Sequence, residues 1–319
     1  MKVLITGAGG FVGRHLFAAL SRSEPGADII LTGRRGAMDP HLGEIAELDV
    51  TDATAVGDAI ARFAPDRVVH LAGLAAPAEA ARDRDAAWRI NLGGTLTVAR
   101  AILARAPACG LLFAGSGHVY GGSAASGEPM TEDTPLAPLD DYAASKAAAD
   151  LALNALAGEG LRCLRFRPFN HIGPGQREAF VLPAFGLQIA RIEAGLGPAV
   201  LKVGNLDAER DFLDARDVAV AYARGIGAFD RLPAGLVLNL ASGVPRRIGD
   251  LLNRMLASSR VPIEIETDRE RLRPADIPRI VGDAARAREA LGWSPEHAIE
   301  DTISDILEDC RRRVAGGNA

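Results

Sequence analysis

The segment Lys2-Val-Leu-Ile-Thr-Gly7-Ala-Gly9-Gly10-Phe-Val-Gly13 sets the architecture of this chain. It begins with an apolar run typical of a buried strand, and an amphipathic helical pattern follows at once. Glycines between a strand and a helix let the backbone approach a phosphate group, whose charge meets the amides of the helix N-terminus. The segment therefore predicts a strand–turn–helix unit that holds the pyrophosphate of a dinucleotide. A tight strand-to-helix turn that binds nothing is the alternative.

The first half of the chain alternates short apolar runs with longer amphipathic segments. This alternation predicts an α/β fold built on a doubly wound parallel sheet of the Rossmann type. The runs are apolar without interruption, as in strands whose two faces are both covered by helices. We expect strands at Val3–Thr6, Ile29–Thr32, Ile45–Val50, Val68–Ala72, Leu111–Ala114 and Cys163–Phe166, with a returning edge strand at Leu236–Ala241. We expect helices at Val12–Ser21, Thr54–Phe63, Asp85–Ala106 and Asp141–Leu156.

The alternation ends after Pro168, where loops rich in glycine, proline and charged residues take over. A chain of 319 residues can hold one large domain or two intimate ones. We expect a dinucleotide-binding domain of residues 1–168 and 214–243, interleaved with a smaller C-terminal substrate-binding lobe of residues 169–213 and 244–319.

Composition excludes several classes of protein. Hydrophobic residues make up 48% and charged residues 24%, and the net charge of −5 offers no basic field for nucleic acid. The three cysteines, Cys109, Cys163 and Cys310, form no Cys-x-x-Cys pair, which argues against a disulfide framework or a zinc site. No apolar run approaches the ~20 residues of a membrane span. We therefore expect a cytoplasmic protein with no metal and no membrane contact.

The ends of the first four expected strands offer contacts to a dinucleotide. Where an NAD-specific site usually has an acidic residue, the second strand ends in Arg34 and Arg35. Because Arg34 can pair with a 2′-phosphate, we favour NADP(H) and keep NAD(H) as possible; a solvated arginine pair is the alternative. The expected contacts are Gly7, Gly10, Phe11, Val12, Arg34, Asp49, Val50, Leu71, Ala72 and Gly73. We expect His70 to be a buried histidine with its hydrogen bonds satisfied.

Ser116, Tyr142 and Lys146 are the expected catalytic residues. Tyr142 and Lys146 are four residues apart, which stacks a phenol and an ammonium on one helix face, where both would also contact the cofactor. Ser116 follows the fifth strand, at the sheet edge where open α/β folds gather their sites. We expect the Lys146 ammonium and the nicotinamide to lower the pKa of Tyr142. Tyr142 would then protonate a substrate oxygen held by Ser116 while hydride reaches the carbon.

These motifs resemble the extended short-chain dehydrogenase/reductase superfamily, which acts largely on nucleotide sugars. The resemblance rests on the pattern Gly7-x-x-Gly10-x-x-Gly13, on Ser116-x-x-x-Tyr120-Gly and on Tyr142-x-x-x-Lys146, and it covers nearly the whole chain. A non-catalytic dinucleotide sensor on the same fold is the remote alternative, but it would not need the Tyr142/Lys146 pair.

Three motifs in the second half are similar to segments of GDP-hexose enzymes. They are Arg167-Pro-Phe-Asn170-His171-Ile-Gly-Pro-Gly-Gln176, Lys202-Val-Gly-Asn-Leu-Asp-Ala-Glu-Arg210-Asp-Phe and Arg271-Leu-Arg273-Pro-Ala-Asp276. Together they resemble GDP-4-keto-6-deoxy-D-mannose reductases, which form GDP-D-rhamnose, and the related GDP-mannose 4,6-dehydratases. The resemblance implies a GDP-sugar substrate and places Pro168 at the nicotinamide. It also implies substrate contacts from Asn170, Lys202, Arg210, Arg273 and Asp276, beside Ser116 and Tyr142.

His118 favours a reductase over a dehydratase. The dehydratases resembled here have a glutamate two residues after the serine or threonine, whereas this chain has Gly117-His118 and no carboxylate. We therefore expect NAD(P)H-dependent reduction of a 4-keto group, with His118 bonding sugar hydroxyls. A 4,6-dehydratase or 4-epimerase that retains its cofactor is the alternative. As such enzymes often form dimers, we expect a homodimer through a four-helix contact of Asp85–Ala106 and Asp141–Leu156.

Overall fold

The segment Lys2–Thr6 forms strand β1, and its alternate side chains enter two different hydrophobic cores. This follows from the computed structural model of the chain, which describes residues 1–271 and 277–317. Val3 and Ile5 lie in the core beneath helices α1 (Phe11–Ser23) and α8 (Ala215–Ala228). Leu4 points the other way, into the core beneath α2 (Ala53–Phe63), α5 (Thr95–Arg105) and α6 (Asp141–Gly158). Successive residues of a strand face opposite sides, so an unbroken apolar run needs helices on both faces.

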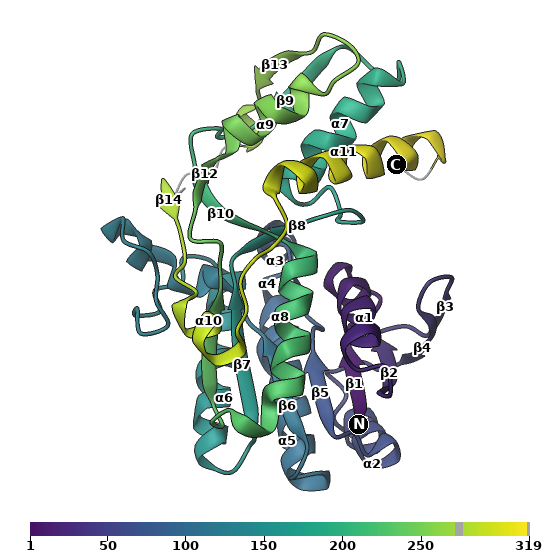
Figure 1. Cartoon of the computed structure of the whole chain (residues 1–319), viewed down its shortest axis with the longest axis vertical. Helices are drawn as coiled ribbons and strands as arrows, with labels where there is room; N and C mark the ends of the chain where they lie inside the picture. The colour runs from purple at the N-terminus through teal and green to yellow at the C-terminus, as the bar shows by residue number, and fades with distance from the viewer. Residues whose placement is uncertain (272–276, 318–319) are drawn as a thin grey trace.

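The doubly wound parallel sheet predicted from the sequence is confirmed. The described residues form an eight-stranded sheet in the order β11-β7-β6-β5-β1-β2-β4-β3 (Figure 1). Its further strands are β2 (Asp28–Gly33), β4 (Gly43–Glu47), β5 (Arg67–His70), β6 (Gly110–Ala114), β7 (Cys163–Pro168) and β11 (Leu236–Leu240), all parallel, with β3 (Ala37–Asp39) antiparallel at one edge. The strand order reverses between β1 and β5, and such switch points open a crevice at the carboxyl ends of the strands.

The turn from β1 to α1 can only be built with glycine. Gly7 has a φ of +70°, and a Cβ atom there would lie 2.8 Å from the backbone of Ala72. A Cβ atom at Gly13 would lie 2.1 Å from the carbonyl oxygen of Ala8, so this glycine lets α1 pack directly on the strand. Gly7 is therefore needed for the backbone conformation of the turn, and Gly13 for the close packing of α1 on the strand.

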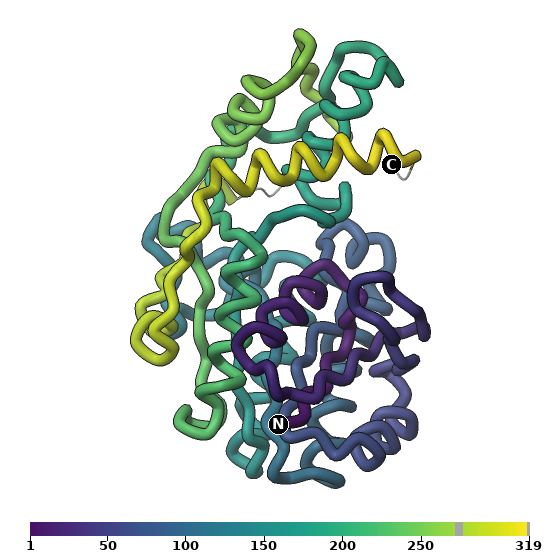
Figure 2. Tube along the Cα trace, turned by 45° about the vertical axis from the view of Figure 1, so that its right-hand side comes forward, coloured from purple at the N-terminus to yellow at the C-terminus, as the bar shows by residue number. Residues whose placement is uncertain are grey.

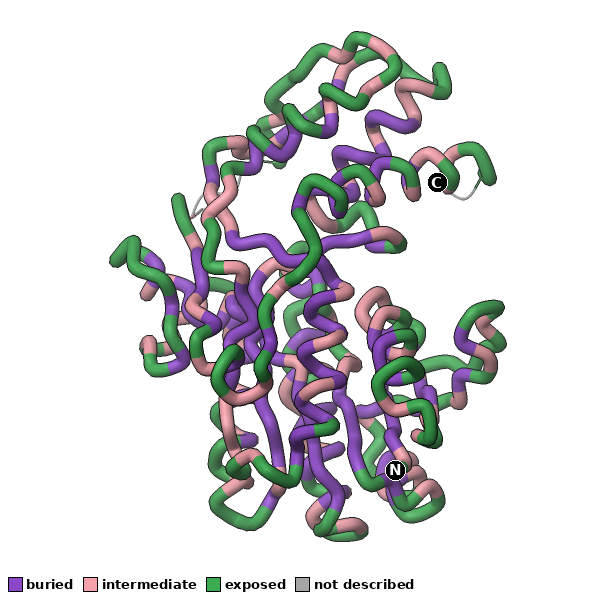
Figure 3. The backbone as a smooth tube through the Cα atoms, viewed as in Figure 1, coloured by how far each residue is buried: buried purple, intermediate pink, exposed green. Residues whose placement is uncertain are grey.

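The second half of the chain adds a lobe with its own hydrophobic core. Helices α7 (Val181–Glu193), α9 (Ile248–Ala257) and α11 (Ile299–Ala315) enclose that core, and α11 crosses the lobe as the yellow helix of Figure 2. Figure 3 shows the two buried regions, one along the large sheet and one between the helices of the lobe. The strands of the lobe are β8 (Asn170–Ile172), β10 (Glu209–Asp214), β12 (Pro245–Arg247) and β14 (Arg279–Ile280) in one sheet, with β9 (Val200–Val203) and β13 (Glu264–Thr267) paired separately.

The expected helix Asp85–Ala106 is wrong as a single element. The chain forms α4 (Arg84–Ala87), a π-helical segment η1 (Trp88–Gly94) and then α5. Asn91 lies in the π-helical segment because its side chain bonds both the amide and the carbonyl of Leu74, at 2.9 and 3.3 Å. Such local widening of a helix is frequent at functional sites.

The third expected strand, Ile45–Val50, is also displaced. Strand β4 ends at Glu47, so Asp49 and Val50 belong to the loop after it. Asp49 instead accepts hydrogen bonds from the amide and hydroxyl of Thr51, at 2.9 and 2.8 Å, which turns the chain away from the sheet.

No helix in the described part of the chain combines the length and the apolar character needed to cross a bilayer.

Candidate active site

A cleft of about 1670 Å³ runs from the glycine turn of β1 to the lobe. The predicted site residues that line it are Gly7, Gly10, Phe11, Val12, Arg34, Asp49, Val50, Leu71, Ala72, Gly73, Ser116, His118, Tyr142, Pro168, Asn170, Lys202 and Arg210. Lys146 lies behind this lining, and Arg273 and Asp276 lie outside the described residues. A cleft of this size exceeds an ordinary small-molecule pocket and can hold two nucleotides end to end.

The glycine turn fits the pyrophosphate of a dinucleotide. Gly10 is the N-cap of α1, no side chain caps the helix, and its first turn contains no acidic residue. The amides of Phe11 and the residues after it therefore remain available to an anion beside the cleft. The Phe11 ring also lies parallel to His171 of β8, with 6.3 Å between the ring centres, so the turn meets the lobe here.

The far end of the cleft carries arginines suited to the adenosine half. Arg34 and Arg35 follow β2, and within the described residues neither makes a hydrogen bond or ion pair with another side chain. Arg89, which the sequence reasoning missed, lines the same cleft from the π-helical segment. Hydrogen bonds from Thr51, helped by the charges of Arg34 and Arg89, hold the pKa of Asp49 below its usual value.

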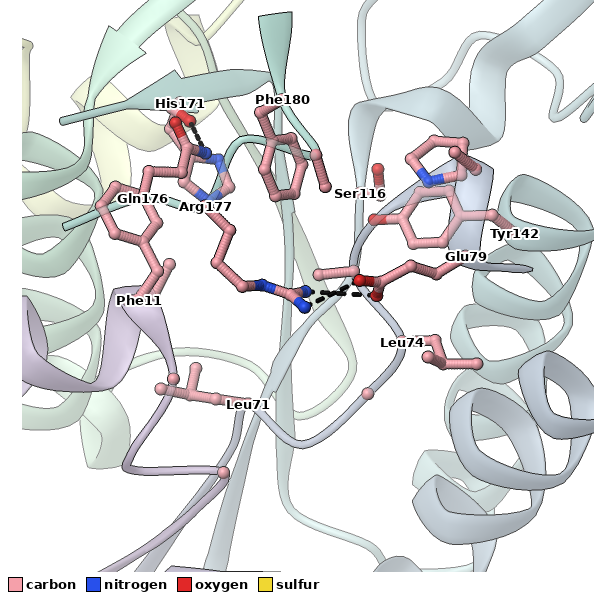
Figure 4. Close-up of a pocket in the computed structure, with 18 of the residues that line it drawn as sticks. Phe11, Leu71, Leu74, Glu79, Ser116, Tyr142, His171, Gln176, Arg177 and Phe180 are labelled. Carbon is pink, nitrogen blue, oxygen red and sulfur yellow. Dashed lines mark hydrogen bonds and ion pairs between the residues drawn. The ribbon is translucent and has the colours of Figure 1, made fainter. Parts of the chain in front are cut away.

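The expected catalytic residues Ser116 and Tyr142 lie together at the inner end of the cleft (Figure 4). Ser116 follows β6 and accepts a hydrogen bond from the amide of His118 at 3.1 Å, which fixes its side chain. Asp140 caps α6 by accepting a bond from Ala143, so Tyr142 sits in the first turn of a well-anchored helix.

The predicted fall in the pKa of Tyr142 is wrong for the protein alone. Burial raises the pKa of Tyr142, and hydrogen bonding with Ser116 opposes this only in part. The ammonium of Lys146 donates instead to the carbonyl oxygen of Ala114, at 2.9 Å, and lies 5.2 Å from the centre of the Phe113 ring. Burial lowers the pKa of Lys146 to about 8. The ammonium of Lys146 therefore bonds the end of β6 rather than the Tyr142 hydroxyl.

His118 and Asn170 line the cleft beside Tyr142. His118 bonds Asn170 of β8 through its Nε2 atom, at 3.1 Å, and its ring lies edge-on to Tyr142 with 5.8 Å between the centres. These two expected substrate residues are thus brought together beside the phenol. Lys202 and Arg210 line the cleft farther out, from β9 and β10.

The expected role of His70 is confirmed. Its two ring nitrogens bond the hydroxyls of Thr6 and Thr95, at 2.8 and 3.1 Å, and the residue is buried. Burial lowers the pKa of His70 to about 3, so the ring is neutral at ordinary pH. Among the described residues, no group of three or more His, Cys, Asp or Glu side chains is placed to hold a metal ion.

A bidentate ion pair across the cleft was missed by the sequence reasoning. Arg177, in the segment between β8 and α7, donates to both carboxylate oxygens of Glu79, at 2.7 and 3.2 Å. Glu79 lies in α3 (Pro77–Arg82), which follows β5. Figure 4 shows the pair between Leu71 on one side and Ser116 and Tyr142 on the other. Nothing in the sequence connects two residues that lie 98 positions apart.

Taken together, the doubly wound sheet, the uncapped glycine turn and the Ser116/Tyr142/Lys146 set define a dinucleotide-binding α/β protein with a short-chain dehydrogenase/reductase type of site. Residues 3–241 match the NAD dependent epimerase/dehydratase family. The chain belongs to this family, as the resemblance noted in the sequence predicts.

Individual relatives agree with this assignment over nearly their full lengths. The chain is 38% identical to GDP-6-deoxy-D-mannose reductase of Pseudomonas aeruginosa over 314 residues, 98% of each protein. The structure of RMD from Pseudomonas aeruginosa complexed with NADPH superimposes with a TM-score of 0.85 at 37% identity, covering 98% of this chain and 99% of that one. UDP-glucose 4-epimerase from Thermus thermophilus, in complex with NAD, gives 0.83 at 26% identity, covering 98% and 99%.

Proposed function

We propose that this chain reduces the 4-keto group of GDP-4-keto-6-deoxy-D-mannose to a GDP-6-deoxyhexose, GDP-D-rhamnose, at the expense of NAD(P)H. The observation that carries the proposal is the buried Tyr142 hydroxyl beside Ser116, at the inner end of the cleft that starts at the glycine turn. The similarity to a GDP-6-deoxy-D-mannose reductase over 98% of both chains supports the choice of substrate.

Each catalytic side chain has a distinct part in the proposed reaction. The bound nicotinamide would supply hydride to the sugar carbon. Ser116 holds the carbonyl oxygen by hydrogen bonding, and Tyr142 donates its proton to that oxygen as charge develops there. Because burial keeps the pKa of Tyr142 high, the phenol carries its proton at neutral pH, the form that a reduction requires. Lys146 adds a nearby positive charge behind the site.

The surroundings of Tyr142 favour reduction over 4,6-dehydration. Dehydration also has to remove a proton from carbon 5 and expel a hydroxyl from carbon 6, for which a carboxylate beside the serine is suited. The position two residues after Ser116 is His118, and its Nε2 atom is engaged by Asn170. A lone hydroxyl as the proton donor matches a single-step reduction.

Mixing the protein with GDP-4-keto-6-deoxy-D-mannose and NADPH or NADH tests this function. We expect one nicotinamide to be oxidised for each sugar reduced, measured by the loss of nicotinamide absorbance. GDP-mannose or UDP-glucose supplied in place of the keto sugar should leave the absorbance unchanged. Conversion of either of these sugars without net oxidation would instead make the protein a dehydratase or an epimerase.

We propose that NADP(H) is the preferred cofactor. Arg34 and Arg35 line the cleft just after β2, and neither makes a hydrogen bond or ion pair with another described side chain, which suits recognition of a 2′-phosphate. The relative solved with NADPH is more similar to this chain than the relative solved with NAD, at 37% against 26% identity. We expect Arg34→Ala to weaken NADPH binding about tenfold without changing NADH binding, since it removes one charge-assisted bond. An unchanged ratio of the two dissociation constants would contradict this preference.

We also propose that the protein is a cytoplasmic homodimer. The three cysteines are free and buried, as suits a reducing compartment. On α6, Leu151 is 58% exposed, on a helix that shares one face of the sheet with α5. An apolar side chain at this position suits a two-fold contact between these helices and their copies.

A further inference from the structure

Tyr120 and Arg167 belong to the motifs singled out in the sequence, yet neither lines the cleft. Tyr120 is fully buried, and Arg167 is 4% exposed. Arg167 makes hydrogen bonds to three other parts of the chain. Its guanidinium bonds both carboxylate oxygens of Asp150, at 2.9 and 3.0 Å, the hydroxyl of Tyr120 at 3.0 Å and the carbonyl oxygen of Glu132 at 3.2 Å.

These bonds connect the elements that carry the catalytic side chains. Asp150 lies on α6, eight residues after Tyr142 and four after Lys146, so it shares a helix face with both. Tyr120 lies on the 3-10 helix η2 (Gly117–Ser126), whose N-cap is Ser116. Arg167 itself lies on β7, directly before Pro168 at the cleft.

A second arginine completes the arrangement. Arg165, two residues earlier on β7, bonds Asp150 at 2.6 Å, Asn154 of α6 at 2.8 Å and the carbonyl oxygen of Gly235. Asp150 is completely buried between the two guanidinium groups. Tyr120 in turn donates to the side chain of Asn239 on β11, at 2.6 Å. Arg165, Arg167, Asp150 and Tyr120 thus form one buried hydrogen-bonded cluster, the Asp150 cluster.

A gain in stability does not by itself explain why the Asp150 cluster is buried. Removing charges from water is costly, and apolar side chains of similar volume often stabilise a protein as well as a buried ion triad does. Directional bonds, however, fix how α6 is rotated and where η2 begins, which an apolar contact does not. A guanidinium that grips a carboxylate through two atoms also resists sliding of the helix along the strand.

We propose that Arg167 is a positioning residue, which with Asp150 and Tyr120 holds Ser116 and Tyr142 in register for proton transfer. The inference rests on the proposed reductase function, since it concerns the rate of that reaction. A displacement of about 1 Å between reacting groups can cost on the order of 100-fold in rate. Binding of the dinucleotide to the glycine turn does not depend on this register.

The test compares Arg167→Lys and Tyr120→Phe with the wild-type enzyme. We expect kcat for the keto sugar to fall about 10- to 100-fold in Arg167→Lys and about 10-fold in Tyr120→Phe. The KM for the sugar and the dissociation constant of NADPH should stay within about twofold of wild type, because neither side chain lines the cleft. Lysine at position 167 should not restore the activity, since it keeps the positive charge but cannot form the bidentate hydrogen bonds to Asp150.

Arg311→Lys is the matched control. Arg311 on α11 makes a close, largely buried ion pair with Glu193 of the lobe, at 2.6 Å, and neither residue lines the cleft. Arg311→Lys should also lose stability but should keep the wild-type kcat. Rates are compared per folded molecule, with the folded fraction measured by circular dichroism.

Each other outcome overturns the inference. It fails if kcat in Arg167→Lys and Tyr120→Phe stays at the level of the control, or if only KM and NADPH binding change. If Arg167→Lys does not fold, Tyr120→Phe decides, because it removes a single oxygen and keeps the buried ring. A wild-type enzyme that oxidises no NADPH with the keto sugar would refute the proposed function, and the inference with it.

Discussion

Tyr142 and Lys146 illustrate how burial decides the charge of a side chain. The spacing of the two residues suggests that the ammonium lowers the pKa of the phenol, but the structure aims that ammonium at the carbonyl oxygen of Ala114. Both residues are buried, so desolvation disfavours the charged form of each and moves their pKa values in opposite directions. Tyr142 therefore keeps its proton at neutral pH, and Lys146 is the group that changes charge at moderately alkaline pH.

This difference predicts a pH profile for the reduction. Burial lowers the pKa of Lys146 to about 8, so its positive charge is present below that pH and lost above it. We expect kcat to be constant near neutral pH and to fall as pH rises through about 8. Lys146→Arg should move this fall to higher pH, since a guanidinium stays charged. A fall at the same pH in both enzymes would contradict the assignment to Lys146.

His70 gives a second prediction, on stability. Its folded-state pKa of about 3 lies below the unfolded value of ~6.5, so the unfolded chain takes up a proton first as pH falls. The neutral, buried ring thus stabilises the fold above pH ~6.5, and this contribution is lost as pH falls toward 3. We expect about 2 kcal/mol of this loss between pH 7 and 5.

Urea unfolding at the two pH values measures this effect. His70→Gln should be less stable at pH 7, because it disturbs the bonds to Thr6 and Thr95, but it should lose about 2 kcal/mol less than wild type on going to pH 5. Equal losses in the two proteins would show that His70 does not titrate on unfolding.

At the scale of the elements, the long, continuous patterns were predictable and the short ones were not. The unbroken apolar run of β1 and the alanine- and leucine-rich helical segment of α6 each predict their element to within about two residues. Strands such as β14 (Arg279–Ile280) contain too few residues to show any period, and they form only because partners in the lobe supply the hydrogen bonds. The π-helical segment depends on Asn91 meeting Leu74, a tertiary contact.

The residues of the site likewise fall into those that the sequence could predict and those that it could not. Residues next to a strand end, such as Ser116 and the glycines, could be placed because parallel strands bring their carboxyl ends to one edge. The pair Glu79–Arg177 and the bonds of Arg167 join distant segments, and the sequence contains no local signal of them. Arg273 and Asp276 stay predictions from resemblance, and the domain boundaries at residues 168, 214 and 243 stay predictions from the change of sequence pattern after Pro168.

The Glu79–Arg177 pair joins α3 to the segment before α7 across the cleft, which leads to a prediction on cofactor exchange. Exposed ion pairs contribute about 0–1 kcal/mol, enough to slow an opening motion by up to about fivefold. We expect Arg177→Gln to release NADPH about two- to fivefold faster in stopped-flow fluorescence. Arg254→Gln, which breaks an exposed pair with Glu300 within the lobe, is the control. Equal release rates in the two variants would exclude a role in closure.

At the scale of the whole molecule, the cleft runs from the large sheet, which has a hydrophobic core on each face, to the lobe, which has a core of its own. The chain crosses from the sheet to the lobe between β7 and β8 and returns between β10 and α8 (Figure 1). Residues of β8 line the cleft. Asn170 of the lobe bonds His118, whose ring lies edge-on to Tyr142 of α6, so residues of both parts of the chain lie together in the cleft. Although the net charge of the chain is −5, the cleft is lined by several arginines, which suits the binding of two phosphorylated ligands.

The proposed dimer is tested at this scale as well. Because Leu151 is exposed on α6, a charge placed there should disrupt an apolar helix contact. We expect Leu151→Glu to be monomeric by light scattering while NADPH binding is retained. Leu196→Glu, on an exposed loop of the lobe, should leave the assembly unchanged. A wild-type monomer, or a Leu151→Glu dimer, would contradict the four-helix contact.

The central claim is that the Tyr142 hydroxyl delivers the proton in a one-step reduction by nicotinamide. A single-turnover measurement with NADPH already bound, started by adding GDP-4-keto-6-deoxy-D-mannose, isolates that step. We expect Tyr142→Phe to slow NADPH oxidation by about 10²–10⁴-fold with an unchanged NADPH dissociation constant, because only the proton source is removed. Oxidation within tenfold of the wild-type rate would mean that another group donates the proton, and the proposed mechanism would be wrong.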